Sequence, residues 1–377
     1  MWVSSVDLSN FRNYELAQLT LQPGAILLFG ENGEGKTNLL EALHFASSLE
    51  SHRVAGYQSL IQEKAKSSQI ALRVNSAARE LLIGFELNKD KTNRYFLNGN
   101  QVRKSHEILG VLSSVLFAPE DLDLVRRDPA DRRAFLDEAV IQLKPRMAGV
   151  KQDYDRVLKQ RNALLKSAKS VKNPDLTTLD IWDEQLVRLG VEIILQRLAL
   201  IELLKPLLQD FYQKLSAKAE AIEIKLVSAI GDDDELSELP TKPSELADLF
   251  HEKLRQLRDR ELDRGITLVG PHRDEMLILK DSLPARSHAS QGEAWSLALG
   301  LKLALAQLLR EASTTGDPVL LLDDVFAVLD VGRRTRLLEF VLGFEQVIVT
   351  AADRAMAPEI SWAKVFEVRG GVIGSED

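Results

Sequence analysis

The feature that most constrains the fold of this chain is a glycine-rich run between two apolar segments. An apolar run, residues 25–29, comes before it, and residues 39–45, whose apolar side chains recur at helical spacing, come after it. This order matches the strand, loop and helix of a P-loop and predicts an α/β fold. The alternative is an ordinary glycine turn before a helix. The members of the run are Gly30, Glu31, Asn32, Gly33, Glu34, Gly35, Lys36 and Thr37.

The residue types in this run suit the binding of a nucleoside triphosphate. Glycine tolerates the turns that aim successive backbone N–H groups at a phosphate, and the following helix contributes the positive end of its dipole. Lys36 is then expected to reach the β- and γ-phosphates, and Thr37 to place its hydroxyl on Mg²⁺. We therefore predict that the run binds ATP together with Mg²⁺.

A pair of acids follows a second buried strand. The aliphatic residues 319–322 are followed directly by Asp323 and Asp324. A P-loop ATPase needs a carboxylate at the end of a strand beside the P-loop. We expect Asp323 to hold Mg²⁺, through water or through Thr37, and Asp324 to orient the water that attacks the γ-phosphate.

A serine turn lies about 30 residues before this acidic pair. Ser290 begins the sequence Ser-Gln-Gly-Glu, and an apolar helix is expected from Gln291 to Arg310. Ser290 could simply cap that helix. The order of P-loop, long insertion, serine turn and Asp-Asp strand nevertheless resembles that of ABC-type ATPase heads. In those heads the serine turn of one subunit closes over the γ-phosphate held by another, so the resemblance implies an ATP-dependent homodimer with Ser290 at a composite catalytic site.

Composition limits the remaining possibilities. The chain has no cysteine, which excludes disulfides and thiolate-bound metals and suits a reducing cytoplasm. No basic, apolar leader is visible at the N-terminus, and no apolar stretch is long enough for a bilayer, so neither export nor a membrane partner is expected. The net charge of −8 argues against general DNA binding, so DNA contacts must come from a local basic patch.

The chain divides into three segments by pattern. We expect an N-terminal ATPase lobe at residues 1–120, an inserted helical arm at 121–264 and a C-terminal ATPase segment at 265–377. The two ends are expected to share one sheet. In the arm, a near-heptad seam between residues 182 and 211 predicts a helical hairpin with the preceding helix, or else two helices packed on a globular lobe.

Charge is segregated within the arm. Residues 144–172 carry nine Lys or Arg against two acids, whereas residues 231–248 carry seven acids against one Lys and are expected to form an exposed loop. A turn is expected at residues 173–175. Four arginines just before the basic stretch could contact DNA or form a solvated helix face: Arg126, Arg127, Arg132 and Arg133.

Five motifs in order make the chain resemble the RecF family over nearly its whole length. They are Phe-Arg-Asn-Tyr at 11–14, the P-loop run GENGEGKTNLLEA, LFAPEDLDLV with residues 129–137, Gly-Pro-His-Arg-Asp at 270–274, and LLLDDVFAVLD. The resemblance implies an ABC-type ATPase head, related to structural-maintenance-of-chromosomes heads, with a shortened arm. It also implies that Arg12 lies near the nucleotide phosphates.

The function implied by this resemblance is ATP-dependent binding of duplex DNA at single-strand gaps. RecR and RecO are the implied partners in loading RecA, and hydrolysis is expected to be slow and to serve release. One alternative is an ATP-dependent nuclease of the overcoming-lysogenisation type, although little chain follows Thr350 to hold a second metal cluster. Another is a chromosome-tethering or transporter-associated ATPase subunit, which would need a longer coiled coil or a membrane partner.

The chain departs from the family pattern at three places. Trp295 stands where an Arg is frequent, Val328 where a Glu is frequent, and residues 350–352 lack the switch His of many ABC ATPases. The first two departures affect polar contacts expected across the dimer interface. The third means that a residue other than His must sense the γ-phosphate. The Gly-Pro-His-Arg-Asp turn suggests no mechanism from sequence alone.

Overall fold

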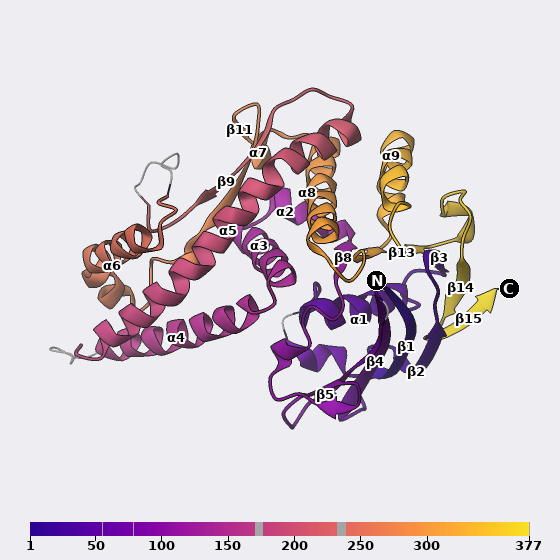
Figure 1. Cartoon of the computed structure of the whole chain (residues 1–377), viewed down its shortest axis with the longest axis horizontal. Coiled ribbons are helices and arrows are strands. Elements are labelled where there is room, and N and C mark those ends of the chain that lie inside the picture. The colour runs from indigo at the N-terminus through magenta and orange to yellow at the C-terminus, as the bar shows by residue number, and fades with distance from the viewer. Residues whose placement is uncertain (55, 78, 170–175, 232–238, 377) are drawn as a thin grey trace. The chain divides into compact units, whose positions relative to one another are not determined.

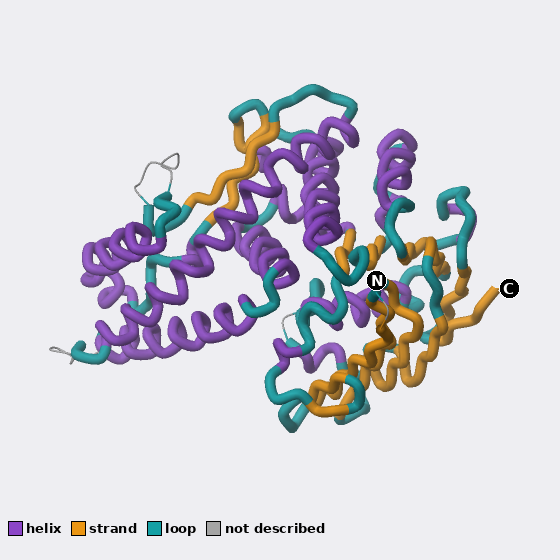
Figure 2. The backbone as a smooth tube through the Cα atoms, viewed as in Figure 1, coloured by secondary structure: helices purple, strands orange, loops and turns teal. Residues whose placement is uncertain are grey.

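The computed structural model describes residues 1–54, 56–77, 79–169, 176–231 and 239–376. These residues form two compact units (Figures 1 and 2). Unit 1 contains residues 1–125, 207–220 and 290–377, and unit 2 contains residues 126–206 and 221–289. The turn expected at residues 173–175 and the centre of the expected acidic loop, residues 232–238, lie outside the described residues. The prediction of a loop as far as residue 248 is wrong, because a helix begins at Pro243, the proline at its first position, and buries Leu246.

The first sheet of unit 1 unites the two ends of the chain, as expected from the sequence. Its inner strands are short aliphatic runs, which is typical of parallel strands buried on both faces. Neighbouring strands are parallel except at one edge, where β15 runs antiparallel to β14. In spatial order the strands are β15 (Val372–Glu376), β14 (Lys364–Arg369), β3 (Gly24–Phe29), β13 (Gln346–Ala351), β12 (Val319–Leu322) and β8 (Ser114–Phe117).

The second sheet of unit 1 is antiparallel and carries the alternating pattern of half-buried strands. Helix α1 (Lys36–Ser48) packs against both sheets: it contacts β8 and β13, and its Phe45 ring meets Phe85 of β5 edge-to-face at 5.4 Å. This explains why α1 is buried almost all round. The strands are, in spatial order, β2 (Tyr14–Thr20), β1 (Trp2–Phe11), β4 (Ser67–Ser76), β5 (Arg79–Asn88), β6 (Arg94–Leu97) and β7 (Asn100–Gln101).

Two further helices of unit 1 begin at side-chain caps. Ser290 starts α8 (Gln291–Ala312), and Asp330 starts α9 (Val331–Val341) by accepting a bond from the backbone N–H of Arg333 at 2.9 Å. The short helix α2 (Asp123–Arg126) ends at the boundary with unit 2. The helix expected between Gln291 and Arg310 is therefore present and extends two residues further.

Unit 2 is mostly helical, with a small antiparallel sheet in which β10 pairs with β9 and β11. The 38-residue helix α5 passes through the boundary between the units at Pro206. Its seam is shared: Gly190 of α5 faces both Tyr154 of α4 and Phe250 of α6, so the helices do not form a simple two-helix hairpin. The elements are α3 (Pro129–Leu143), α4 (Met147–Ala168), α5 (Leu179–Ser216), β9 (Ile222–Val227), α6 (Pro243–Arg264), β10 (Glu275–Lys280), β11 (Leu283–Pro284) and α7 (Ala285–His288).

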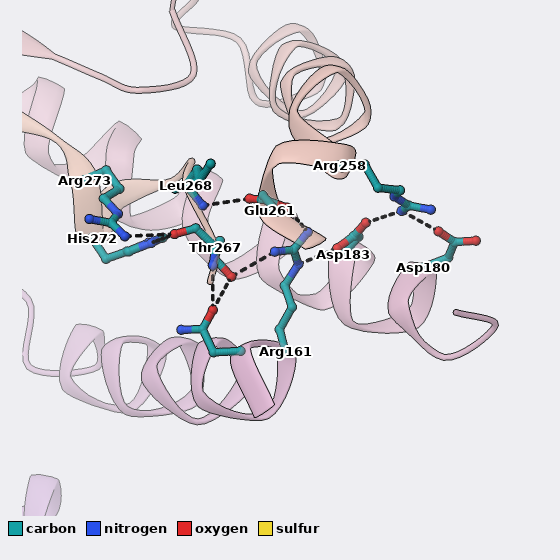
Figure 3. Close-up of polar contacts among 10 residues, drawn as sticks. Arg161, Asp180, Asp183, Arg258, Glu261, Thr267, Leu268, His272 and Arg273 are labelled. Atoms are coloured by element: carbon teal, nitrogen blue, oxygen red, sulfur yellow. Dashed lines mark hydrogen bonds and ion pairs between the residues drawn. The ribbon is translucent and has the colours of Figure 1, made fainter. Parts of the chain in front are cut away.

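A cluster of buried charges joins the helices of unit 2 (Figure 3). Arg161 of α4 is fully buried and donates to Asp183 of α5 at 2.6 Å, to Glu261 of α6 at 2.6 Å and to Thr267 at 2.8 Å. The other Asp183 oxygen accepts from Arg258 at 2.6 Å. Each acid thus meets a cation, as buried charges require.

The Gly-Pro-His-Arg-Asp turn anchors a second buried cluster. Arg197 of α5 donates to the Pro271 carbonyl at 2.7 Å and to the buried Asp274 at 3.3 Å. Tyr154 hydrogen-bonds His272 Nδ1 at 2.7 Å. The turn therefore fastens α4 and α5 to β10, and this structural role accounts for a motif that sequence alone left unexplained.

None of the helices in the described ranges is long and apolar enough to cross a membrane.

Candidate nucleotide-binding site

The predicted P-loop lies at the carboxyl end of β3 and leads into α1. Gly35 caps α1 with a φ of 124°, a conformation that L side chains rarely adopt, and a side chain there would also collide with Asn13 and Tyr14. At Gly30 a Cβ would lie 2.1 Å from the carbonyl oxygen of Val368. Both glycines are therefore required by the backbone path of the loop.

Lys36 lies inside the loop that precedes it. Its ammonium donates to the carbonyl oxygens of Gly30 at 2.5 Å and Glu31 at 2.9 Å. Burial lowers the pKa of Lys36, while the nearby carboxylates of Asp324 and Asp323 act in the opposite direction. The ammonium thus rests on neutral acceptors, which phosphate oxygens can replace with stronger, charge-assisted bonds.

The sheet order brings the acidic pair to the same edge as the P-loop. In this sheet β13 lies between β3, which leads into the P-loop, and β12, which ends just before Asp323. Its Oδ1 accepts from the hydroxyl of Thr37 at 3.0 Å and from that of Thr350 at 2.8 Å. Burial raises the pKa of Asp323, and the two hydroxyl bonds oppose that shift. A hydroxyl and a carboxylate in contact fit the oxygen ligands that Mg²⁺ prefers.

Thr350 is a site residue whose role the sequence did not reveal. Besides its bond to Asp323, its hydroxyl oxygen accepts from the backbone N–H of Asp324 at 2.8 Å. Asp324 adopts a left-handed φ of 52°. Thr350 therefore holds both Asp323 and Asp324 in place. It lies in the segment 350–352, which lacks the switch His of many ABC ATPases. The only available signal was a hydroxyl near the end of an otherwise mostly aliphatic strand, which continues to Ala351.

The outer side of the P-loop is held by two other segments: the Phe-Arg-Asn-Tyr motif, whose contacts the sequence did not reveal, and a hairpin that sequence reasoning missed. From the β1–β2 turn, Asn13 donates to the Glu34 carbonyl at 2.8 Å and Tyr14 donates to the Gly35 carbonyl at 2.8 Å. From the β14–β15 hairpin, the backbone N–H of Gly370 donates to the Glu34 carboxylate, and that of Gly371 donates to the Glu34 carbonyl at 3.2 Å. Glu34 thus faces the hairpin.

Arg12 lies beside α1. Its guanidinium forms a two-pronged ion pair with the buried Glu41, at 2.8 and 2.6 Å, and donates to the Ser59 carbonyl at 3.0 Å. Burial acts to raise the pKa of Glu41, but hydrogen bonds from Arg12 and Ser51 lower it. Among the described residues the hydrogen bonds of the Arg12 side chain do not reach the P-loop, so its role at the phosphates stays a prediction.

Ser290 forms a capping box at the start of α8. Its backbone N–H donates to Glu293 Oε2 at 2.8 Å, and its hydroxyl accepts from the Glu293 N–H at 3.4 Å. In the described part of the chain its hydrogen bonds are all to residues of α8. The structure thus brings Lys36, Thr37, Asp323 and Asp324 together, and it leaves the exposed Ser290 turn without a hydrogen bond to them.

The other two departures from the family pattern have different surroundings. Trp295 is 6% exposed and belongs to the core of unit 1, which suits an apolar residue better than an Arg. Val328 is 45% exposed and Val331 is 78% exposed, on either side of Leu329 and Asp330. This segment therefore presents two apolar side chains to solvent beside the exposed carboxylate of Asp330.

Comparison with known proteins gives a consistent result for the whole chain. Residues 2–373 match the family described as RecF/RecN/SMC N terminal domain. The chain is 47% identical to the DNA replication and repair protein RecF of Clavibacter sepedonicus, over 99% of this chain and 95% of that protein. It is 44% identical to the protein of the same name from Leifsonia xyli, over 99% of both.

Solved structures give the same result. The recombination mediator protein RecF-ATP of the RecFOR pathway superposes with a TM-score of 0.91 at 29% identity, covering 100% of this chain and 98% of that one. An Smc head domain from Pyrococcus furiosus, bound to the C-terminal domain of ScpA, superposes with a TM-score of 0.53 at 16% identity, which is a likeness of fold alone. The ABC-type α/β head predicted from sequence is thereby confirmed.

Proposed function

This chain belongs to the RecF family, and we propose that it binds ATP and acts on DNA in replication and recombinational repair. The observation that carries the proposal is the 3.0 Å bond between Thr37 and Asp323, which lie 286 residues apart in sequence. It joins the two halves of a P-loop ATPase site in one chain. The named RecF relatives and the RecF structure with ATP support the same function.

Each residue of the site receives a role from its position. The backbone N–H groups of Gly30 to Gly35 and the Lys36 ammonium would bind the phosphates. Thr37 and Asp323 would hold Mg²⁺, which neutralises phosphate charge when bound. Asp324, fixed through its backbone by Thr350, would accept a hydrogen bond from the attacking water. Arg12, which bonds Glu41 of α1, would lie near the nucleotide phosphates.

The second part of the proposal is an ATP-dependent homodimer. Ser290 begins a buried helix yet is itself exposed, and its hydrogen bonds stay within α8. Such a turn can contact a phosphate held by another copy of the chain. The exposed Val328 and Val331 would add apolar area to that contact. Hydrolysis would then separate the copies slowly and end the DNA-bound state.

The third part concerns DNA and protein partners. In this proposal the protein binds duplex DNA at single-strand gaps and loads RecA together with RecR and RecO. Segments 1–120 and 265–377 would form the ATPase head, and segment 121–264 would form the helical arm. Of the four arginines considered, Arg132 pairs with Glu275 at 2.6 Å and Arg133 donates to the Asp274 carbonyl. The exposed Lys159, Lys166 and Lys169 of the basic stretch are better placed for phosphates. The near full-length match to RecF proteins disfavours the nuclease and tethering alternatives.

The decisive experiment replaces Ser290 by Arg, which fills the turn and leaves the P-loop intact. We expect the variant to bind ATP as a monomer but to lose ATP-dependent dimerisation in sedimentation experiments, and with it hydrolysis. Thr314→Arg, at an exposed position two residues beyond the end of α8, is the matched control. Mixing Ser290→Arg with Lys36→Ala protein should recover part of the hydrolysis, because one of the two sites then has neither defect. Normal dimerisation of Ser290→Arg would show that Ser290 is only a helix cap.

A further inference from the structure

We propose that Lys218 is a positioning residue for the Ser290 turn, and that it neutralises the Glu293 carboxylate so that the turn can receive a phosphate. The inference rests on the proposed composite site, and it adds a residue from outside every motif. Lys218 lies two residues beyond the end of α5, whereas Glu293 lies in the first turn of α8.

The contacts of Glu293 carry the first step. Its carboxylate is mostly buried, with one oxygen, Oε2, accepting from the Ser290 N–H at 2.8 Å. The other oxygen, Oε1, accepts from the Lys218 ammonium at 2.5 Å. One carboxylate therefore joins the serine turn to Lys218. Moving or removing the Lys218 ammonium therefore changes the surroundings of the Glu293 carboxylate, which holds the Ser290 N–H.

The second step is electrostatic. A carboxylate beside a triphosphate repels it, and the repulsion grows as water is excluded from a closing interface. The bond to Glu293 raises the pKa of Lys218, so the cation is present at neutral pH. The Arg333 guanidinium also lies close by, 3.0 Å from the place of a Cβ on Gly292, but it pairs with Asp330. The charge of Glu293 is therefore offset by Lys218, whose ammonium bonds the Glu293 carboxylate directly.

The third step connects Lys218 to the long helix. The segment after α5 is fixed by Gln209, which donates to the Glu220 carbonyl at 3.0 Å, and by Tyr212, which bonds the Glu220 carboxylate. Arg336 of α9 donates to the Leu215 carbonyl at 2.8 Å. Lys218 is therefore held by the last turns of α5, a helix that begins in unit 2. A displacement of this end of α5 would move Lys218 relative to Glu293.

The test uses the full chain and three variants. Lys218→Ala should bind ATP as tightly as the wild type but dimerise roughly tenfold more weakly with ATP and Mg²⁺, an ordinary size for coupling between sites. Lys218→Arg should restore dimerisation because it keeps the charge. Lys214→Ala is the matched control, since Lys214 lies on α5 and pairs with Asp210 at 2.6 Å. Thermal unfolding confirms that each variant folds.

A double variant separates neutralisation from simple support. In Glu293→Gln the amide oxygen can still accept from the Ser290 N–H, but the charge that Lys218 offsets is gone. Adding Glu293→Gln to Lys218→Ala should therefore recover most of the lost dimerisation. Wild-type dimerisation by Lys218→Ala, or no recovery in the double variant, would overturn the inference while Ser290→Arg still fails to dimerise. Normal dimerisation of Ser290→Arg would instead overturn the composite site, and this inference with it.

Discussion

The candidate nucleotide-binding edge of unit 1 and the charge clusters of unit 2 use similar residues in opposite ways. In unit 2, Arg161 is enclosed by Asp183, Glu261 and Thr267, and every one of these bonds is between side chains. In unit 1, Lys36 rests on two backbone carbonyls, and Asp323 accepts from two hydroxyls. The acids and the cation of unit 1 are close enough to affect the Lys36 pKa.

This difference separates structural charge from charge available to a ligand. Breaking one partner out of a saturated buried cluster leaves an opposite charge in a medium of low dielectric, which is strongly destabilising. A cation held by neutral carbonyls loses little when those bonds are exchanged for bonds to phosphate. The comparison therefore predicts that unit 2 variants lose stability and unit 1 variants lose ATP binding or turnover.

The largest effect is expected for Arg161→Met. It leaves Asp183 and Glu261 buried opposite an apolar chain, and we expect a loss of about 3–5 kcal/mol in the free energy of unfolding, measured by urea denaturation. ATP affinity at low temperature should be unchanged. Lys159→Met, an exposed position on the same helix, should cost less than about 0.5 kcal/mol. An equal loss of unfolding free energy in Arg161→Met and Lys159→Met would show that the buried cluster contributes no more to stability than an exposed charge does.

Asp324→Asn should slow hydrolysis by about a hundredfold, because an amide orients the attacking water less well than a carboxylate. Asn tolerates the left-handed backbone of this position, so ATP binding and folding should persist. The measurement is steady-state phosphate release, with Asp90→Asn on the surface of the same unit as the control. Unchanged turnover would assign the water-orienting role to another residue.

Lys36→Ala should weaken ATP binding by about 10- to 100-fold, which corresponds to the roughly 1.5–3 kcal/mol of a charge-assisted bond. Because burial already disfavours this cation, the free energy of unfolding should fall by less than about 1 kcal/mol. Titration with a fluorescent ATP analogue measures the first effect, and Lys64→Ala serves as an exposed control. Wild-type affinity would refute the P-loop assignment.

The smallest effect is a pH dependence of unit 2. Burial lowers the pKa of His272 from 6.5 to about 4, so the fold favours the neutral ring. Its stabilisation is complete above pH 6.5 and is lost as pH falls towards 4, by at most about 1.4 kcal/mol per pH unit. Burial raises the pKa of Asp274 to about 6, which acts in the opposite sense below that pH.

The difference between the wild type and His272→Asn isolates the His272 contribution, since Asp274 is common to both. Unfolding free energies measured from pH 7 to 5 should converge as the wild type loses its advantage. His288→Asn, at an exposed histidine of the same unit, should leave the wild-type slope unchanged. Parallel curves for the wild type and His272→Asn would mean that the ring binds protons equally in the folded and unfolded states over this range, so that folding does not lower its pKa.

Sequence identified the elements whose signal is local. The P-loop run and the strand Val319–Leu322 were expected at the positions where the structure has them, because a buried strand, a glycine turn and a helix cap are each written in a few consecutive residues. The start of α8 at Ser290 follows the same rule. The assignment to the RecF family also came from short motifs in a fixed order.

Other features depended on residues far apart in the chain. The hairpin that holds Glu34, the Lys218–Glu293 pair and the Arg161 cluster join positions separated by 336, 75 and 100 residues. No local pattern marks Arg161 as buried, since on a charged helix it is counted with the exposed lysines around it. Because Arg161 is buried, residues 144–172 expose fewer cations than the nine Lys and Arg counted in their sequence.

The sequence by itself identified the P-loop run, the acid that we propose holds Mg²⁺, and the family, because backbone geometry and side-chain chemistry at those positions are local properties. Only the tertiary structure decided which charges are available to a ligand and which are used up within the fold. That outcome depends on which opposite charges the packing brings within about 3 Å, and on how much water the packing removes from around them.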